Sequence, residues 1–282
     1  MPELPEVETV RRSLLEGLIG RVITGVKVHA FAGVVGDAGP EAFPARVVGR
    51  RVVTLRRRGK YLLLDLNDRT CLVVHLRMTG RLLLMERSAA PVRFEHLVLE
   101  LDDGQDLRFA DQRKFGRVLH LNPDQMTQLD GRIGPEPLNP AFSSSALANL
   151  LVGRRGKLKS VLLDQAVIAG LGNIYVDEAL HRARLHPERP AGTLAPEEVR
   201  RLHRAIRTVL REGLANRGTT FSSFQNGRGE AGDNLMNLRV YGRGRTGEPC
   251  LSCGQPLRLA TVSGRSTHYC SRCQPAVRDS SS

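Results

Sequence analysis

The sequence lacks any apolar run approaching the roughly 18 residues of a membrane span, which argues against a membrane-spanning protein. It also lacks the start of a signal peptide. Glu3, Glu6 and Glu8 stand where such a peptide carries positive charge, and no suitable apolar region follows them. We therefore expect a cytoplasmic protein, without a membrane partner, that folds in a reducing compartment.

Negative charge is the scarcer charge in this chain. Asp and Glu number 29 against 42 Lys and Arg, which leaves a formal net charge of +13. This excess favours an anionic partner, with nucleic acid ahead of an anionic membrane; the solvated basic surface of an ordinary enzyme is the alternative. The 282 residues, 41% hydrophobic and 25% charged, suffice for two globular domains with separate cores.

Cysteine is rare, and four of the five cysteines form two Cys-x-x-Cys pairs. They are Cys250, Cys253, Cys270 and Cys273. In a reducing compartment such clusters bind metal more often than they form disulfides. Two pairs can complete a closed tetrahedral site, so the spacing predicts one structural Zn²⁺ ion with no open position for catalysis.

The predicted zinc ion would hold the hairpin that lies between the two pairs. Its tip, residues 263–266, would project Arg265 outward. His268 could replace a zinc ligand, but four thiolates suffice, so we expect His268 at the surface. Cys71 stands alone in an apolar stretch and is predicted to be a buried core thiol.

Residues 1–130 show one helix followed by strands. Val7, Val10, Leu14 and Leu18 recur on one face of a helix that Gly20 ends. Short apolar runs separated by turn residues then predict strands at 22–28, 47–55, 61–66, 72–76, 82–85, 96–101, 107–110 and 118–121. Short, regularly spaced strands are typical of an antiparallel sandwich or barrel.

Residues 131–142 are rich in Gly and Pro and are interpreted as a linker. Beyond it the pattern becomes helical, with helices predicted at 143–152, 161–169 and 173–184 and from Pro196 onward. The polar, Gly-rich loop 217–234 ends this helical domain of residues 143–234 and is predicted to be mobile and functional. Residues 235–282 form the predicted zinc ribbon.

Three short segments are candidates for chemistry. Removal of Met1 would give Pro2 a free secondary amine, which can form a Schiff base, and Glu3 beside it could exchange protons; an ordinary helix start is the alternative. The basic run at 56–60 is either a solvated turn or a phosphate contact. Residues 170–173 are either a plain helix–helix turn or a phosphate site at a helix N-terminus.

Four motifs in order resemble the formamidopyrimidine-DNA glycosylase and endonuclease VIII family of base-excision repair enzymes. They are the start P-E-L-P-E-V-E-T, G-L-G-N-I-Y at 170–175, V-Y-G-R before the zinc segment, and the ribbon itself. The resemblance implies an α+β fold: an N-terminal helix with an antiparallel β-sandwich, then a helical domain with a helix–two-turn–helix motif and a four-cysteine zinc ribbon. It further implies that double-stranded DNA lies between the domains, bound by a monomer associated with the nucleoid.

The resemblance also implies the roles of individual residues. Pro2 is the expected nucleophile at C1′ of the damaged nucleotide, and Glu3 the proton donor for opening of the sugar ring. Lys60 is associated with β-elimination and phosphate contact, and Arg265 with the flanking phosphates and δ-elimination. Four further residues are expected DNA contacts: Asn173, which would bind a phosphate, Arg154, His75 and Tyr241.

A base inside a stacked duplex must be flipped out before it can react, and side chains should fill the gap. By resemblance, Met78 and Phe115 would fill it and Arg113 would face the partner base, consistent with cytosine there. From the residues alone, a Met and a Phe in strand patterns usually belong to a core. This filling set is typical of enzymes that remove oxidised purines, namely 8-oxoguanine and formamidopyrimidines. Loop 217–234 would cover the everted base.

The chain departs from the family pattern at four positions. Gln112 replaces a proline, Lys114 an arginine, Arg77 a glycine and Phe94 a DNA-contacting histidine. These changes leave the catalytic residues in place and affect the substrate range and phosphate contacts. Two alternatives remain open: an endonuclease VIII-like glycosylase for oxidised pyrimidines, and a non-catalytic zinc-ribbon DNA-binding protein, which would have no use for Pro2 and Glu3.

Overall fold

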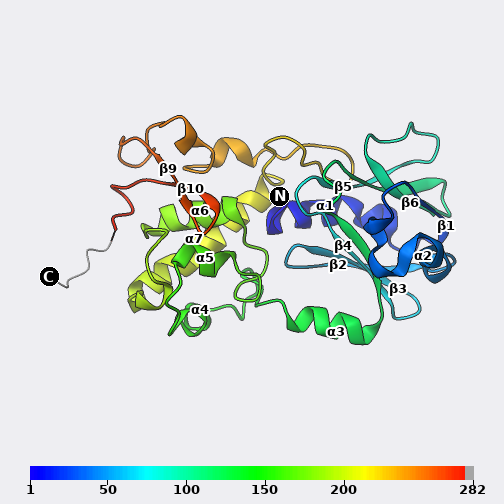
Figure 1. The fold of residues 1–282 in the computed structure, drawn as a ribbon, viewed down its shortest axis with the longest axis horizontal. Coiled ribbons are helices and arrows are strands. Elements are labelled where there is room, and N and C mark those ends of the chain that lie inside the picture. Colours follow the sequence, from blue (N-terminus) through cyan, green and yellow to red (C-terminus); the bar gives the residue numbers. More distant parts are fainter. Residues whose placement is uncertain (277–282) are drawn as a thin grey trace. The chain divides into compact units, whose positions relative to one another are not determined.

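The computed structural model describes residues 1–276, and the chain divides into two compact units (Figure 1). The first unit contains Met1–Arg132 and Gly213–Leu235, and the second contains Ile133–Glu212 and the chain from Met236 onward. Loop 217–234, which the sequence analysis assigned to the helical domain, therefore belongs to the first unit. Each unit is described by itself.

The first unit begins with helix α1 (Leu4–Leu18), whose predicted apolar face is buried. Val7, Val10, Leu14 and Leu18 are each 0% exposed. The helix gives way at Ile19 to an extended backbone, and Gly20 follows with φ +86°, a conformation that costs glycine little. The helix packs against strands of both sheets, so its apolar face becomes part of the core of the unit.

Two antiparallel four-stranded sheets form the rest of the core. One has the order β1-β6-β7-β5 and the other β2-β3-β4-β8. The strands are β1 (Ile23–Val28), β2 (Val52–Arg58), β3 (Tyr61–Leu66), β4 (Cys71–His75), β5 (Gly80–Glu86), β6 (Glu95–Leu101), β7 (Gln105–Asp111) and β8 (Arg117–Leu121). Side chains from both sheets meet in one apolar cluster. The predicted sandwich is confirmed, and Cys71 is buried as expected.

Three helical segments of this unit were not predicted. They are the 3₁₀ segment η1 (Ala32–Ala38), α2 (Gly39–Val47) and α3 (Pro123–Gly131). The strand predicted at 47–55 was wrong in its first half, because Val47 ends α2 and Gly49 turns the chain with φ +80°. Met126 and Leu129 of α3 pack on the outer face of the second sheet.

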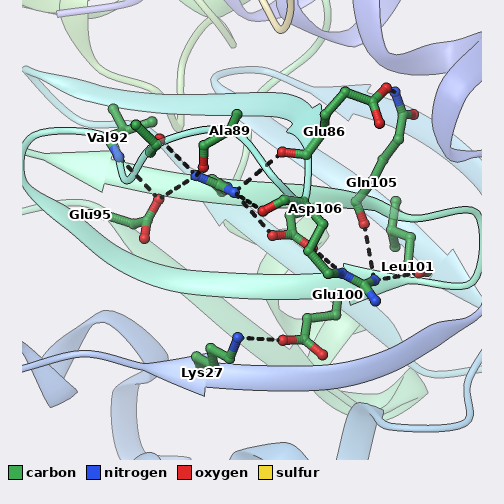
Figure 2. A network of polar contacts seen from close by, with 12 residues as sticks. Lys27, Glu86, Ala89, Val92, Glu95, Glu100, Leu101, Gln105 and Asp106 are labelled. Carbon is green, nitrogen blue, oxygen red and sulfur yellow. Dashed lines mark hydrogen bonds and ion pairs between the residues drawn. The ribbon is translucent and has the colours of Figure 1, made fainter.

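A buried arginine holds the connection between β5 and β6. Arg108 is 4% exposed and forms ion pairs with Asp106 at 3.2 Å and Glu95 at 3.7 Å (Figure 2). Its guanidinium also donates to the backbone carbonyls of Glu86, Arg87, Ala89 and Ala90. Because one planar group satisfies several carbonyls, this connection is fixed to the sheet without secondary structure of its own.

The second unit contains helices α4 (Ser144–Leu151), α5 (Leu158–Leu163), α6 (Asn173–Ala183) and η2 (Ala191–Thr193) and most of α7 (Pro196–Ala215). The helix predicted at 161–169 was wrong, because α5 ends at Leu163. The Asp164 side chain accepts the N–H of Ala166 at 2.9 Å and forms a local turn instead.

The ribbon follows the 3₁₀ segments η3 (Asn234–Asn237) and η4 (Arg243–Arg245). Strands β9 (Arg258–Val262) and β10 (Arg265–Tyr269) pair in an antiparallel hairpin. Ser263 and Gly264 form its two-residue turn, both with positive φ, a geometry that matches the natural twist of a hairpin. None of the helices within residues 1–276 has the length and apolar character needed to cross a lipid bilayer.

Candidate functional site

The N-terminal residues differ sharply in exposure. Met1 is 47% exposed, whereas Pro2 is buried and Glu3 is 2% exposed at the start of α1. The Glu3 N–H donates to Oε2 of Glu6 at 2.8 Å. The nitrogen of Pro2 is an amide while Met1 is attached. After Met1 removal it would be an amine near the positive end of a helix dipole, which favours its unprotonated form.

Glu6 links the N-terminus to loop 217–234, and the sequence analysis gave it no role. Its carboxylate is 1% exposed and accepts the Glu3 N–H with one oxygen. The other oxygen accepts the N–H of Thr219 at 2.8 Å. A Cβ on neighbouring Gly218 would lie 3.1 Å from Glu6 Cγ, so only glycine fits easily beside the carboxylate. The partners are 213 residues apart in sequence, so no local pattern indicates this contact.

The far half of loop 217–234 is attached to α1 and β5 through Gly227. The Gly227 N–H donates to Oγ of Ser13 at 2.8 Å, and its carbonyl accepts the N–H of Leu84 at 2.9 Å. A Cβ on Gly227 would lie 2.4 Å from Leu14. Between these attachments, Phe221 is 48% exposed. Phe224 in the same stretch is 8% exposed and packs into the core of the unit, so the loop is also held between the two attachments and is exposed at Phe221 and Ser222.

The basic run at 56–60 is mostly strand rather than turn. Arg56 pairs with Asp65 at 2.5 Å and Arg58 with Asp130 at 2.5 Å. Only Gly59 and Lys60 connect β2 to β3, and Lys60 is 4% exposed. The carboxylate partners show that two of these cations serve the fold of the free protein.

His75 lies near Lys60 in this part of the first unit. The ring is 8% exposed, and its Nδ1 accepts the N–H of Arg77 at 3.0 Å. Burial, followed by the charges of Arg77 and Lys60, lowers the pKa of His75 to about 3. His75 is therefore a neutral ring whose remaining nitrogen, Nε2, is available as a donor.

Met78, Arg113 and Phe115 form one exposed group in the first unit. Arg113 Nη1 lies 2.8 Å from Sδ of Met78, and its guanidinium lies over the ring of Phe115 at 4.9 Å from the centroid. Met78 is 41% exposed and Phe115 48%. The structure thus brings together the three residues expected to fill a gap in DNA, and Met78 and Phe115 are not core residues.

Asp111 organises the turn that carries this group. Its carboxylate is 1% exposed and accepts the backbone N–H groups of Arg113, Phe115 and Gly116 at 3.1, 2.8 and 2.7 Å. The hydroxyl of Thr79 donates to it as well. Asp111 was not predicted to have a role, although it lies just before Arg113 and Phe115 in the sequence. An Asp at the start of a turn whose backbone amides need acceptors is the signal that could have identified it.

In the second unit, Asn173 contacts the ribbon hairpin next to Arg265. Asn173 is the first residue of α6, and its Nδ2 donates to the carbonyl of Ser266 at 2.8 Å. Arg265 precedes Ser266 at the hairpin turn and is exposed. Arg154 is exposed after α4, and its Nε donates to Leu150 O at 2.7 Å.

A buried ion pair holds β10 against α5 and α6. Lys159 Nζ lies 2.6 Å from Asp177 Oδ1, and the side chains are 0% and 1% exposed. Lys159 also donates to Ser266 O at 2.8 Å, and Asp177 Oδ2 accepts the His268 N–H at 2.8 Å. Desolvation raises the pKa of Asp177 to about 7, against the attraction of Lys159.

His268 and Tyr241 pack together beside this pair. Their rings meet edge to face, with centroids 5.0 Å apart. His268 is 1% exposed, so its expected surface position was wrong. The reason is its place on the inner side of β10, where its backbone N–H reaches Asp177. Tyr241 is half-buried, and its backbone N–H donates to Glu178 at 2.8 Å.

The four ribbon cysteines converge on one point. Their sulfur atoms all lie within 4.8 Å of one another, with Cys250–Cys273 at 3.9 Å and Cys253–Cys270 at 3.5 Å. A tetrahedron with Zn–S bonds of about 2.3 Å has S–S edges of about 3.8 Å, so the set fits one zinc ion. The four thiolates leave no open ligand position, and the ion is structural.

Comparisons with known proteins agree across the chain. Family models match the formamidopyrimidine-DNA glycosylase N-terminal domain over residues 1–118, the H2TH domain of that enzyme over 133–225, and a zinc finger found in FPG and IleRS over 247–276. A formamidopyrimidine-DNA glycosylase of Heliobacterium modesticaldum is 49% identical over 283 residues, covering 97% of this chain and 100% of that protein. One from Herpetosiphon aurantiacus is 44% identical over 274 residues, covering 97% and 100%.

Solved structures agree as well. A Lactococcus lactis FPG variant in complex with DNA containing Fapy-dG matches with a TM-score of 0.90 at 35% identity, covering 98% of this chain and 100% of that one. The MutM (FPG) protein of Thermus thermophilus matches with a TM-score of 0.87 at 40% identity, again covering 98% and 100%. The predicted α+β fold and its zinc ribbon are confirmed, and the chain belongs to the formamidopyrimidine-DNA glycosylase family.

Proposed function

We propose that this chain is a bifunctional DNA glycosylase and abasic-site lyase that removes oxidised purines from duplex DNA. Formamidopyrimidines and 8-oxoguanine are the proposed substrates, in keeping with the names of its relatives and with the Fapy-dG complex of the Lactococcus lactis protein. The observation that carries the proposal is the buried Pro2–Glu3 pair at the start of α1 beneath an exposed Met1.

The first chemical step forms a bond between the Pro2 nitrogen and C1′ of the damaged nucleotide. The C1′–N bond to the base breaks, and the base leaves with the bonding electrons and takes up a proton. The Pro2 nitrogen gives up its own proton to the base or to solvent and becomes a tertiary amine. Glu3 then gives a proton to O4′ as the C1′–O4′ bond opens, which leaves an iminium between Pro2 and the sugar. Covalent attachment divides one difficult displacement into two easier steps.

The iminium makes strand cleavage possible, because it acidifies the C2′ proton. Loss of that proton and breakage of the C3′–O bond constitute β-elimination, with the 3′ phosphate as the leaving group. Loss of the C4′ proton and breakage of the C5′–O bond then constitute δ-elimination, with the 5′ phosphate as the leaving group. Lys60 is the proposed aid to β-elimination, and Arg265 with Asn173 is proposed to hold the phosphates. Hydrolysis of the imine then frees the amine for another turnover.

The exposed group of Met78, Arg113 and Phe115 is proposed to occupy the gap left by the everted base. Unstacking a base step costs a few kcal/mol, so a rigid apolar filler lowers the cost of flipping. His75, Arg154 and Tyr241 are proposed as further DNA contacts, and loop 217–234 as the cover of the base. The protein is proposed to act in the cytoplasm, where it would associate with the nucleoid.

Borohydride trapping tests the proposal, because hydride reduces the iminium to a stable amine and locks protein to DNA. We expect trapping on 8-oxoguanine duplex, little with Pro2→Gly, and full trapping with Pro5→Ala, a nearby proline outside the proposed chemistry. Undiminished trapping by Pro2→Gly would place the nucleophile elsewhere. Faster cleavage of thymine glycol than of 8-oxoguanine would favour the endonuclease VIII-like alternative.

A further inference from the structure

The last turn of α6 carries a histidine that contacts a zinc ligand. His181 is 4% exposed, and its Nε2 lies 3.4 Å from Sγ of Cys250, which is itself 2% exposed. The two residues are 69 positions apart in sequence. We propose that His181 donates a hydrogen bond to the zinc-bound thiolate of Cys250, strengthening zinc retention and shielding that sulfur from electrophiles.

The hydrogen-bonding capacity of the ring fixes the direction of this bond. A thiolate bound to zinc carries no proton, so the hydrogen must come from the histidine. The other ring nitrogen, Nδ1, is buried and has no partner within residues 1–276. A neutral ring with its single N–H on Nε2 satisfies the sulfur and leaves only an acceptor unpaired. A doubly protonated ring would bury a second N–H without an acceptor, which is costly.

The neighbours of His181 on α6 hold it in this orientation. Asn173, Asp177 and Glu178 precede it at helical spacing that places these side chains along one side of the helix. Each binds the C-terminal part of the chain: Asn173 at Ser266, Asp177 at the His268 N–H, and Glu178 at the N–H groups of Arg239, Val240 and Tyr241. His181 is thus the final contact in a row that attaches the ribbon to α6.

The bond has a defined chemical consequence. Four thiolates around Zn²⁺ give the centre a net charge of about −2, and an N–H donor draws electron density from one sulfur. That sulfur becomes less nucleophilic toward peroxide or alkylating agents, and its orientation toward the metal is fixed. Loss of comparable partners of metal ligands lowers metal affinity about 10–100-fold.

The zinc-loaded full-length protein provides the test. His181→Phe keeps a ring of similar size without the N–H. We expect its zinc affinity, measured by competition with a chromophoric chelator, to fall about tenfold, and zinc release by hydrogen peroxide to accelerate several-fold. In Co²⁺-loaded protein the thiolate-to-cobalt absorption band should shift. None of these measurements depends on glycosylase activity.

His186→Phe is the matched control. The ring of His186 packs edge to face on Tyr269 of the same hairpin, with centroids 5.2 Å apart, and its Nδ1 accepts the backbone N–H of Glu188 at 3.2 Å. This variant should retain zinc as the unaltered protein does. Equal affinity, release rate and absorption in His181→Phe and His186→Phe would overturn the proposal.

A second measurement needs no substitution and so does not depend on whether a variant folds. In protein loaded with ¹¹³Cd, the Nε2 proton of His181 should show scalar coupling to the metal across the hydrogen bond. Nitrogen chemical shifts should also identify the ring as the Nε2–H form. An Nδ1–H ring, or the absence of coupling in fully loaded protein, would refute the bond.

Discussion

Arg113 Nη1 lies 2.8 Å from Sδ of Met78 while its guanidinium covers the ring of Phe115. The residues proposed to enter DNA therefore contact one another before any DNA is present. A group assembled in advance loses less side-chain entropy on binding than three independent side chains would. The turn that holds these three side chains together should therefore contribute to DNA binding as much as the side chains themselves do.

Asp111→Ala is expected to disrupt that turn. The N–H groups of Phe115 and Gly116 and the Thr79 hydroxyl would lose their acceptor, at a cost of about 1–3 kcal/mol for each buried donor left unpaired. The Arg113 N–H would keep only its bond to Thr79 Oγ1. Excision of 8-oxoguanine should slow far more than cleavage at a preformed abasic site, where no intact base must be flipped. Asp102→Ala, at an exposed position on the β6–β7 turn, is the control. Equal losses on both substrates would contradict a role in flipping.

Glu6→Gln is expected to loosen loop 217–234. The two carboxylate oxygens of Glu6 each accept one N–H group, from Glu3 and from Thr219. A glutamine amide has only one oxygen, so it cannot make both hydrogen bonds in this way. Amide hydrogen exchange at Thr219 should become faster, because the free energy needed to open the loop there should fall by about 1–3 kcal/mol. Glu41→Gln, at an exposed position on α2, should change exchange at Thr219 little. Unaltered exchange in Glu6→Gln would show that the loop is held by other contacts.

His75 predicts a loss of stability in acid. Its pKa is about 3 in the folded protein against a usual 6.5. Below pH 6.5 the unfolded chain binds a proton that the folded chain does not. The contribution of His75 to the free energy of unfolding should therefore be fully present above pH 6.5 and fall by up to about 1.4 kcal/mol per pH unit as the pH drops toward 3.

Urea unfolding of the first unit at several pH values would measure this slope. The variant His75→Asn can still accept the Arg77 N–H, and its free energy of unfolding should change less steeply with pH. An NMR titration of the ring with a midpoint near 6.5, its usual pKa, would contradict the prediction.

The Lys159–Asp177 pair predicts strong coupling in a double-mutant cycle. Lys159→Met or Asp177→Asn alone leaves the other buried group without its partner, at a cost of about 3–5 kcal/mol. The double variant should be less destabilised than the two single effects added together. The exposed pair Lys157–Glu188, with side chains 47% and 44% exposed, should contribute less than about 1 kcal/mol by the same measurement. Additive effects at Lys159 and Asp177 would show that the two groups do not depend on each other.

Local patterns in the sequence predicted much of this fold. Short apolar runs between turn residues marked the strands, helical spacing marked α1, and cysteine spacing marked the zinc site. Helix α3 was missed although Asn122, Pro123 and Gln125 form a helix-start signature whose capping hydrogen bonds are present. The helix-start signature was therefore present in the sequence, but the apolar periodicity of residues 123–131 was too weak to indicate a helix.

Other features could not be read from local patterns. Glu6 meets Thr219 and His181 meets Cys250 only after the chain has folded. Such contacts depend on which elements become neighbours, and spacing within one element says nothing about that. The same limit applies to the buried position of His268, which depends on Asp177 in a different element.

Positions in loop 217–234 differ in the side chains that they can accommodate. A Cβ on Gly232 would lie 2.2 Å from the carbonyl oxygen of Gly218, and one on Gly227 would meet Leu14. By contrast, Phe221 and Ser222 are exposed. Substitutions at Phe221 and Ser222 should therefore disturb the packing of the first unit less than substitutions at Gly227 or Gly232.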